Sequence, residues 1–572
     1  MNGGDRIAAS LRALGVERLF TLCGGHISPI LVAAKACGIR VVDVRDEATA
    51  VFAADATARL SGIPGVAAVT AGPGLTNTLT ALQNARLAQS PLVLLCGAAP
   101  TALQGRGALQ DIEQAPVAAP HVKRVIRVRR VRDLGAAIDE AFRTATGGVP
   151  GPVMVEAPVD LLYDESIVRT WYADAAGKGT SVADRLLRAY LQHHVARMFA
   201  PGNAAAKPRA AAGRELSDSV IDATVRALAR ARRPLAIVGS QALADAGGAQ
   251  RVARAVARID IPVYLSGMAR GLLGPRHTLQ MRHRRRDALR GADCVLLAGV
   301  PCDFRLDYGR HIRRSSTLVA ANRSRHDAHL NRRPSIAAIG DVATFLERLA
   351  DRVGGVETSG WLDELRSRDD VREREIDAQA AASGTHVNAL GLLRAIDAAA
   401  GDDAIFVADG GDFVATASYV LHPRGPLTWL DPGAFGTLGV GAGFALGAAL
   451  CKPESEVWIL YGDGACGYGL VEFDTYVRHG VAPIAIVGND AGWTQIAREQ
   501  VTMLHDDVGT VLSRTAYHEV AAAFGAESIL VQRDDEISHA LARARACAKR
   551  GKPVLVNVWL DRTDFRAGSI SM

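Results

Sequence analysis

Two polar segments in the C-terminal third of the chain carry residue types that could hold a phosphate through a metal ion. Gly462-Asp463-Gly464-Ala465 follows an apolar run, and Gly488-Asn489-Asp490-Ala491-Gly492 follows the next one. Carboxylate, amide and carbonyl oxygens are the ligands that Mg²⁺ prefers, and the ion completes its coordination with phosphate oxygens and water. The candidate ligands are therefore Asp463, Asn489 or Asp490, and a backbone carbonyl, for which Gly492 is the candidate.

The positions of these two segments in the chain favour a diphosphate site over an ordinary turn. Each begins where a predicted strand ends, and ligands bind in the crevice at the carboxyl ends of parallel strands. The glycines, Gly462 and Gly464 among them, let backbone amides approach a phosphate closely. A lone Gly-Asp-Gly is common in turns, but here Asp490 follows Asp463 by 27 residues, at the end of a second strand. The pair predicts a site that binds a diphosphate through a divalent cation.

The elements that must position this site alternate along the chain. Short β-branched runs alternate with helical stretches through most of the 572 residues. Apolar strands between helices predict parallel sheets that are covered on both faces. We predict an α/β protein with three doubly wound parallel-sheet domains. The predicted domains are 1–165, 216–350 and 385–572, joined by linkers at 166–215 and 351–384.

The composition is that of an ordinary globular protein, with 49% hydrophobic residues and a net charge of +6. Aromatic residues make up only 5%, so basic patches interleaved with aromatic residues are not expected, and we expect no nucleic-acid partner. The eight cysteines are scattered without a CxxC pair, which indicates reduced thiols. The sequence shows no signal-peptide pattern and no apolar stretch long enough to span a membrane. These features predict a cytoplasmic protein without a transmembrane segment.

The spacing of Asp463 and Asp490 is similar to the thiamine diphosphate motif, and a second signature near the N-terminus supports this. Residues 44–55 and 70–77 resemble the pyrimidine-binding domain of the acetolactate synthase superfamily. The resemblance implies thiamine diphosphate and Mg²⁺ as cofactors, with Glu47 as the glutamate that hydrogen-bonds N1′ of the aminopyrimidine. Burial among alanine and valine would favour the protonated form of this carboxyl group. The alternative role for Glu47 is a charge in the first turn of a helix.

The same resemblance assigns the other residues around the cofactor. Residues 431–439 resemble the segment that bends it, with Leu438 as the apolar wedge between the rings and the Gly436 carbonyl accepting a hydrogen bond from the 4′-amino group. Gln110 and His26 would face the reactive carbon. Many relatives are apolar at His26, so it either moves a proton or is structural. Further expected contacts are Cys23, Gly24, Gly25, Pro73, Asn77, Gly411, Asp412, Phe413, Gly462, Gly464 and Ala465, although relatives carry polar residues at the positions of Asp412 and Phe413.

Several stretches resemble the acetolactate synthase-like group, which belongs with the 2-hydroxyacyl-CoA lyases. They are 23–29, 239–243, 267–274, 302–306, 488–496 and 562–566. True acetolactate synthases carry a Trp where this chain has Ile496, and they bind flavin in the central domain. Arg285 is similar to an arginine of the acyl-CoA branch, whose central domain binds an adenine nucleotide, and guanidinium groups suit phosphates. CoA and ADP are thus candidate ligands there, FAD is not expected, and a solvated basic patch is the alternative.

The resemblance implies a pyrimidine domain at 1–165, a central domain at 216–350 and a diphosphate domain at 385–572. It implies cleavage of a 2-hydroxyacyl-CoA to formyl-CoA and an aldehyde one carbon shorter, or the reverse condensation of formyl-CoA with an aldehyde or ketone. The alternatives are an acetolactate synthase-like enzyme or decarboxylase acting on free 2-keto acids, and a non-catalytic cofactor-binding scaffold. In this superfamily the cofactor lies between subunits, so a homodimer or homotetramer is expected.

The two linkers each contain a helical pattern. Apolar residues from Val182 to Phe199 fall on one helical face, and Arg185, Arg188 and Arg197 lie off it. This amphipathic helix either packs on its own protein, or touches a membrane surface or the entrance for an acyl chain. The charged stretch at 363–379 in the second linker predicts a surface helix.

Overall fold

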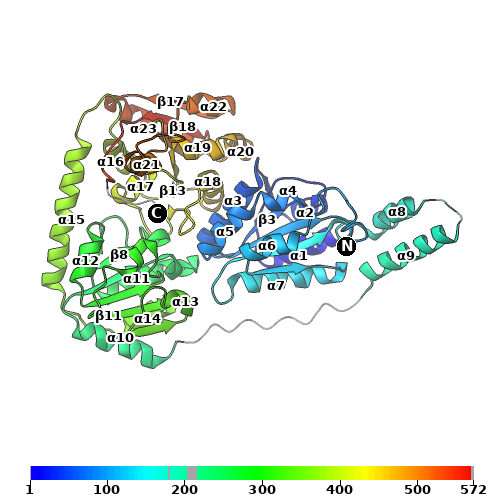
Figure 1. The fold of residues 1–572 in the computed structure, drawn as a ribbon, viewed down its shortest axis with the longest axis horizontal. Helices are drawn as coiled ribbons and strands as arrows, with labels where there is room; N and C mark the ends of the chain where they lie inside the picture. Colours follow the sequence, from blue (N-terminus) through cyan, green and yellow to red (C-terminus); the bar gives the residue numbers. More distant parts are fainter. Residues whose placement is uncertain (1, 178, 180, 202–215, 568–572) are drawn as a thin grey trace. The chain divides into compact units, whose positions relative to one another are not determined.

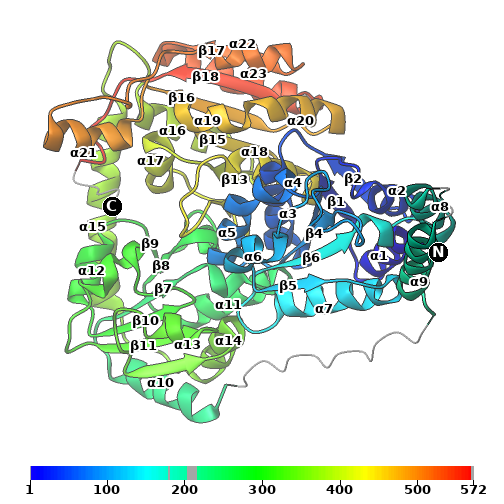
Figure 2. The same ribbon diagram turned by 45° about the vertical axis from the view of Figure 1, so that its right-hand side comes forward.

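The computed structural model describes residues 2–177, 179, 181–201 and 216–567. The chain forms two compact units, residues 1–58 with 63–212 and residues 59–62 with 213–572. Within the described residues the strands form three six-stranded sheets, one in the first unit and two in the second (Figures 1 and 2). All pairings between the named strands are parallel, as expected when helical segments separate consecutive strands. The prediction of three doubly wound α/β domains is confirmed.

The first sheet has the strand order β2-β1-β3-β4-β6-β5. Its central strands β3, β4 and β6 are buried along their whole length, which is why they consist almost entirely of apolar residues. Apolar residues of α1, α2 and α7 form one hydrophobic core with these strands and cover one face of the sheet. The strands are β1 (Arg18–Thr21), β2 (Arg40–Asp43), β3 (Gly65–Val69), β4 (Leu92–Ala98), β5 (Arg124–Arg127) and β6 (Pro152–Pro158). The helices are α1 (Gly3–Ala13), α2 (Ser28–Ala36), α3 (Glu47–Ser61), α4 (Pro73–Thr76), α5 (Leu79–Leu87), α6 (Gln114–Ala118), α7 (Leu134–Thr146), α8 (Glu165–Ala176) and α9 (Val182–Met198).

Helix α9 is the amphipathic helix expected in the first linker. Its N-terminus carries a capping box between Ser181 and Asp184, and it packs against α8. Leu191, Val195 and Met198 are buried in the core of the first unit. Val182, Leu186, Leu187 and Tyr190 are exposed, so only the C-terminal half of the apolar face packs within this unit.

The second sheet has the order β12-β11-β10-β7-β8-β9, and its two faces belong to two separate cores. Alternate residues of β7, such as Ala236 and Ile237, point into opposite cores, as the period of a strand requires. The strands are β7 (Pro234–Val238), β8 (Val263–Leu265), β9 (Gln280–Met281), β10 (Cys294–Ala298), β11 (Thr317–Asn322) and β12 (Ile336–Ile339). The helices are α10 (Asp218–Arg230), α11 (Ala249–Ile259), α12 (Arg285–Gly291), α13 (Arg325–Ala328) and α14 (Val342–Arg352).

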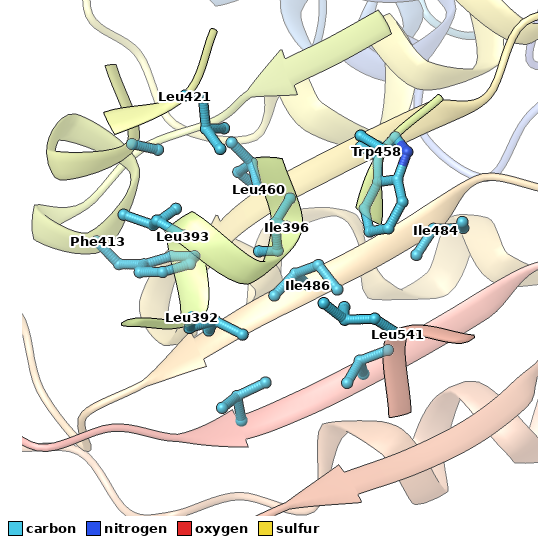
Figure 3. Packing of buried hydrophobic residues seen from close by; sticks show 14 of the residues in the cluster. Leu392, Leu393, Ile396, Phe413, Leu421, Trp458, Leu460, Ile484, Ile486 and Leu541 are labelled. Atoms are coloured by element: carbon cyan, nitrogen blue, oxygen red, sulfur yellow. The ribbon is translucent and has the colours of Figure 1, made fainter. Parts of the chain in front are cut away.

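The third sheet has the order β14-β13-β15-β16-β18-β17. Figure 3 shows one of its faces, where Leu393 and Ile396 of α16 and Leu541 of α23 pack on Leu460 and Ile486. The strands are β13 (Ile405–Ala408), β14 (Trp429–Leu430), β15 (Val457–Gly462), β16 (Ile484–Asn489), β17 (Glu527–Val531) and β18 (Val554–Trp559). The helices are α16 (Ala389–Ala399), α17 (Asp412–Val420), α18 (Val440–Cys451), α19 (Asp463–Gly469), α20 (Phe473–His479), α21 (Thr494–Leu504), α22 (Tyr517–Ala523) and α23 (Ile537–Lys549). No helix of the described part of the chain is long and apolar enough to cross a membrane.

Helix α15 (Ser359–Ala380) connects the second and third sheets. Near its start Trp361 is buried in the core of the second sheet, and near its end Ile376 is buried in the core of the third. Between them Glu373 bonds His283 at 2.7 Å, pairs with Arg394 of α16 and lies 3.8 Å from Arg282. Although burial opposes the charge, the hydrogen bonds from His283 and Arg394 lower the pKa of Glu373 to about 2.

This charge predicts how the stability of the second unit depends on pH. The folded pKa of Glu373 lies below its ordinary value, so its contribution is complete above that ordinary value and disappears as pH falls towards about 2. We expect Glu373→Gln to lower the free energy of unfolding by about 1–3 kcal/mol at pH 7. Thermal melts of both proteins between pH 7 and pH 2 should approach each other at the acid end.

Glu375→Gln is the matched control, because Glu375 lies two residues along the same helix and pairs with exposed Arg284 and half-buried Arg372. This variant should have the thermal midpoint of the wild type over the whole pH range. Equal losses in the two variants at pH 7 would contradict the role assigned to Glu373.

Candidate active site

Three loops meet at the carboxyl edge of the third sheet. Strands β13, β15 and β16 are neighbours, and each ends at one of the predicted segments: 409–413, 462–465 and 488–492. Gly462 pairs in register with Gly488, and its amide donates to the Gly410 carbonyl at 3.0 Å. The structure therefore brings the predicted diphosphate segments together at one crevice.

Bare glycine backbone lines this crevice. A Cβ built on Gly411, which has φ +112°, would lie 3.3 Å from the Cα atom of Gly462, so the first two loops face each other without side chains. A Cβ on Gly464 would lie 2.4 Å from the indole ring of Trp493, which closes the third side. Ala465 is buried just behind Gly464 in α19. A larger residue at either glycine would crowd these neighbours, so the close approach of the loops requires glycine.

Asp463 and Asp490 are the carboxylates of the crevice. Asp463 is buried, and its two oxygens accept from the amides of Gly464 at 2.8 Å and Gly492 at 3.0 Å. Burial, together with the negative charge of Asp490, raises the pKa of Asp463 to about 6. Burial also raises the pKa of Asp490, and the charge of Asp412 adds to the effect. Two carboxylates that repel each other in a partly dry crevice fit a divalent cation, whose charge would offset both.

The other predicted ligands differ in their surroundings. The Gly492 amide donates to Asp463, so this residue lies at the same crevice. Asn489 is fully buried, and its amide group bonds Asn557 of β18 at 3.2 Å and the Ala491 amide at 3.3 Å. Among the described residues no three His, Cys, Asp or Glu side chains form a metal cluster. A cation held here would therefore take further oxygen ligands from phosphate and water.

Asp412 and Phe413 begin α17 but have different environments. Asp412 is buried and pairs with Arg498 of α21 at 2.8 Å, while its Oδ1 and the Nη1 of Arg498 are buried without a hydrogen-bond partner among the described residues. The side chain of Phe413 lies in the hydrophobic core, and a Cβ on Gly488 would be 2.5 Å from its ring. Of this pair, only Asp412 offers polar side-chain atoms to a ligand.

The first unit gathers its predicted residues at the carboxyl edge of its own sheet. Glu47 is the first residue of α3 and is buried, and Asn77 at the end of α4 donates to its Oε2 at 3.0 Å. Pro73 begins α4, and the Gly72 amide before it donates to the buried side chain of Gln114 at 3.0 Å. This arrangement holds the segment 72–77 beside Glu47.

His26 and Gln110 meet at Thr70, directly after β3. The Nδ1 atom of His26 lies 3.0 Å from the Thr70 hydroxyl, which donates to Gln110 at 3.4 Å. A Cβ on Gly24 would lie 2.4 Å from Thr70, which explains the glycine beside Cys23 and Gly25 in this loop. Burial lowers the pKa of His26 and outweighs the opposite effect of a hydrogen bond that the ring donates to Gln110, so the neutral ring is favoured at pH 7. Thr70 was not among the expected side chains, because only the folded sheet places it between two distant loops.

Comparison with known proteins identifies the family of this chain. Family models for thiamine pyrophosphate enzymes match the N-terminal TPP binding domain at 1–117, the central domain at 221–349 and the C-terminal TPP binding domain at 409–558. The chain belongs to this family. It is 48% identical to 2-hydroxyacyl-CoA lyase 2 of Homo sapiens, covering 100% of this chain and 92% of that protein. It is 48% identical to that of Caenorhabditis elegans, covering 100% and 91%. It is 33% identical to the acetolactate synthase large subunit of Mycobacterium tuberculosis, covering 98% and 96%.

The thiamine pyrophosphate enzyme also has a large cavity, of about 890 Å³, between its second and third sheets. Arg270, Arg282 and Arg285 line it together with aromatic side chains such as Tyr419. Burial lowers the pKa of each of these arginines, that of Arg282 to about 10. Arg270 Nε and Arg282 Nη1 are buried without a hydrogen-bond partner in the described structure. Buried cations with unused donors make this cavity suited to an anion.

The wedge segment at 431–439 lies beside the crevice of the third sheet. Leu438 is half-buried, and a Cβ on Gly410 would lie 2.2 Å from its Cδ2 atom, so the leucine rests on bare backbone. Gly436 is exposed with φ +65°, a conformation that favours glycine. Leu438 therefore lies next to the loop that carries Gly411.

The two repelling carboxylates generate a test of the cation site. Without divalent cations, we expect Asp463→Asn to change the thermal midpoint by no more than a few degrees, because the loss of one buried charge offsets the loss of one of its two backbone hydrogen bonds. The same variant should lose the increase in midpoint that thiamine diphosphate with Mg²⁺ produces in the wild type. Thermal melts in the presence of a chelator measure the first effect, and melts with thiamine diphosphate and Mg²⁺ measure the second.

Asp535→Asn, at an exposed position of the same domain, should keep the wild-type response in both conditions. If Asp463→Asn were stabilised by the cofactor and Mg²⁺ as strongly as the wild type, the cation would not bind at this aspartate.

Proposed function

We propose that this enzyme uses thiamine diphosphate and Mg²⁺ to cleave a 2-hydroxyacyl-CoA into formyl-CoA and an aldehyde one carbon shorter. Relatives that carry the name 2-hydroxyacyl-CoA lyase 2 match the chain over its whole length at 48% identity. The same site would also run the reverse condensation of formyl-CoA with an aldehyde or ketone.

The arginine-lined cavity is the observation that carries the choice of a CoA thioester over a free keto acid. A CoA thioester brings several phosphate charges, and guanidinium forks match phosphate oxygens in geometry. Helix α17 connects the two regions: Asp412 at its start lies at the crevice, and Ser418 and Tyr419 near its end line the cavity. Its nine residues span about 14 Å. The cavity would hold the nucleotide end of CoA through Arg285 and its neighbours while the thioester reaches the crevice. ADP is the second candidate for the same cavity.

The residues of the third domain would hold the cofactor by its diphosphate. Asp463, Asp490 and the Gly492 carbonyl would bind Mg²⁺, and the glycines at 411, 462 and 464 would let backbone amides approach the phosphates. When bound, thiamine diphosphate supplies the nucleophilic carbon and the electron sink that carbon–carbon cleavage next to a carbonyl requires. The chain supplies position and charge around it.

The residues of the first domain would hold and transfer the protons of the reaction. Glu47 would share a proton with N1′ of the aminopyrimidine, and the amide of Asn77 at 3.0 Å would hold its carboxyl group in orientation. His26, neutral and held by Thr70, can accept a proton from the 2-hydroxyl of the substrate. Gln110, bonded to the same threonine, would orient the substrate oxygen.

We propose further that Glu47 of one subunit serves the crevice of a second subunit, in a homodimer or homotetramer. The resemblance to the acetolactate synthase superfamily supports this arrangement, because its members bind the cofactor between chains. A single chain would then lack a complete site.

The proposed activity predicts formyl-CoA from a 2-hydroxyacyl-CoA when both cofactors are present, measured by mass spectrometry of the CoA products. Glu47→Gln should lower kcat by about 100-fold or more, because it removes the proton that N1′ needs. Arg285→Gln should raise KM for the acyl-CoA by roughly tenfold with little change in kcat, because a charged contact to phosphate is lost.

Arg258→Gln is the control for Arg285, since Arg258 lies exposed on α11 of the same domain and is absent from the cavity wall. Competitive inhibition by ADP would show that the nucleotide shares the cavity with CoA. Turnover of pyruvate without turnover of any 2-hydroxyacyl-CoA would support the synthase or decarboxylase alternative and refute the lyase.

Mixing two inactive variants tests the shared site. When Glu47→Gln and Asp463→Asn subunits with different tags are co-expressed, each mixed pair contains one site with both native residues. Random pairing should restore about a quarter of the wild-type activity. Sites formed within one chain would leave the mixture inactive.

A further inference from the structure

The loop that carries Leu438 has little rigidity of its own. Between β14 and α18 it contains three glycines with positive φ, Gly433 (+70°), Gly436 (+65°) and Gly439 (+85°). Glycine has access to more backbone conformations than any other residue. The position of Leu438, which stands directly before Gly439, must therefore be set by contacts with other parts of the domain.

Asp409 makes the contact that holds this loop at its end. It follows β13 and is buried, and its Oδ1 accepts from the Gly439 amide at 2.9 Å while its Oδ2 accepts from the Gly441 amide at 2.6 Å. These amides lie at the start of α18, where backbone donors have no partner inside the helix. Because both carboxylate oxygens are used, the contact fixes the backbone after Leu438 in direction as well as distance.

The surroundings of Asp409 leave it no freedom. A Cβ on Gly441 would lie 2.8 Å from its Oδ2 and 2.6 Å from the ring of Tyr461, so the carboxyl group is closely enclosed. The next residue, Gly410, is the surface on which the Leu438 side chain rests. Two consecutive residues thus hold both parts of the wedge, Asp409 its backbone and Gly410 its side chain.

Keeping a carboxylate here opposes folding. Burial raises the pKa of Asp409 to about 7, and the amides of Gly441 and Gly439 offset only part of the effect. Among the described residues, the titratable groups that interact with its charge are Tyr461, Tyr476 and Cys466, and none of them carries a positive charge. A buried group that costs stability without a paired cation is more often retained for a site than for the fold.

We propose that Asp409 is the positioning residue for the bent cofactor, setting through the Gly439 and Gly441 amides how far Leu438 projects between its two rings. This inference rests on the proposed thiamine diphosphate function. In the proposed function the diphosphate is held by the Gly411 backbone and by the segments at 462–465 and 490–492, whereas the Asp409 side chain bonds the Gly439 and Gly441 amides. Asp409 should therefore affect the geometry of the bound cofactor far more than the amount that binds.

The test compares Asp409→Asn with Leu438→Ala and the double variant, each loaded with thiamine diphosphate and Mg²⁺. The asparagine amide cannot accept from a second backbone N–H, so the loop should lose one of its two anchors. Asp409→Asn should lower kcat by roughly 100-fold while KM for the acyl-CoA stays within about twofold. It should also change the circular dichroism of the bound aminopyrimidine and slow exchange of the cofactor C2 proton with deuterated water. Cofactor stoichiometry should stay at the wild-type value.

The double variant should be no worse than Leu438→Ala alone, because both changes remove the same element. Asp341→Asn is the matched control: Asp341 caps α14 in the central domain through the Thr344 amide, so it should lower stability without changing the dichroism or the C2 exchange. Gly410→Ala, which leaves Asp409 intact but displaces Leu438, should reproduce the Asp409→Asn spectrum and serves if that variant fails to fold.

Wild-type dichroism and C2 exchange in Asp409→Asn, or losses that add to those of Leu438→Ala, would overturn the positioning role while leaving the proposed function in place. A wild-type protein that takes up no thiamine diphosphate would instead remove the proposed function itself.

Discussion

Negative charge concentrated at the carboxyl edge of the third sheet is the constraint on which the structure depends. Asp409, Asp412, Asp463 and Asp490 all lie at this edge, at the ends of β13, β15 and β16. Backbone amides and Arg498 compensate part of this charge. The pKa values of Asp409, Asp463 and Asp490 are raised, which indicates that the protein leaves the rest uncompensated. A divalent cation would offset part of this charge and bind the diphosphate as well, so folding and cofactor binding are coupled through the carboxylates that hold it.

Much of this arrangement can be predicted from the sequence, because it depends on local patterns. Apolar strands between helices predict parallel sheets, and the segments after β15 and β16 could be placed at one edge because neighbouring parallel strands end together. The charged stretch at 363–379 was expected as a surface helix, and α15 covers it, although Trp361 at its start is buried. The resemblance to a known family added the roles of Glu47 and Leu438, which no pattern of composition or spacing could supply.

The remaining features depend on contacts between distant segments. Thr70 joins His26 to Gln110, and Asp409 reaches the start of α18, only because the sheets bring these loops together. Phe413 packs into the core and Asn489 bonds a neighbouring strand, and neither fact follows from its place in a motif. Half of the apolar face of α9 is exposed, since periodicity shows that a face exists but not what covers it.

Helix α15 has a consequence for how this chain can change length in evolution. It is 22 residues long, or about 33 Å. Three of its residues must face their partners at the same time. Trp361 faces the core of the second sheet, Ile376 faces the core of the third, and Glu373 faces the basic side chains between them. Because each added residue turns the helix by about 100°, a single insertion between these positions would put the later contacts out of phase. Insertions and deletions should therefore be tolerated in the irregular segment before Ser359 and excluded from the helix itself.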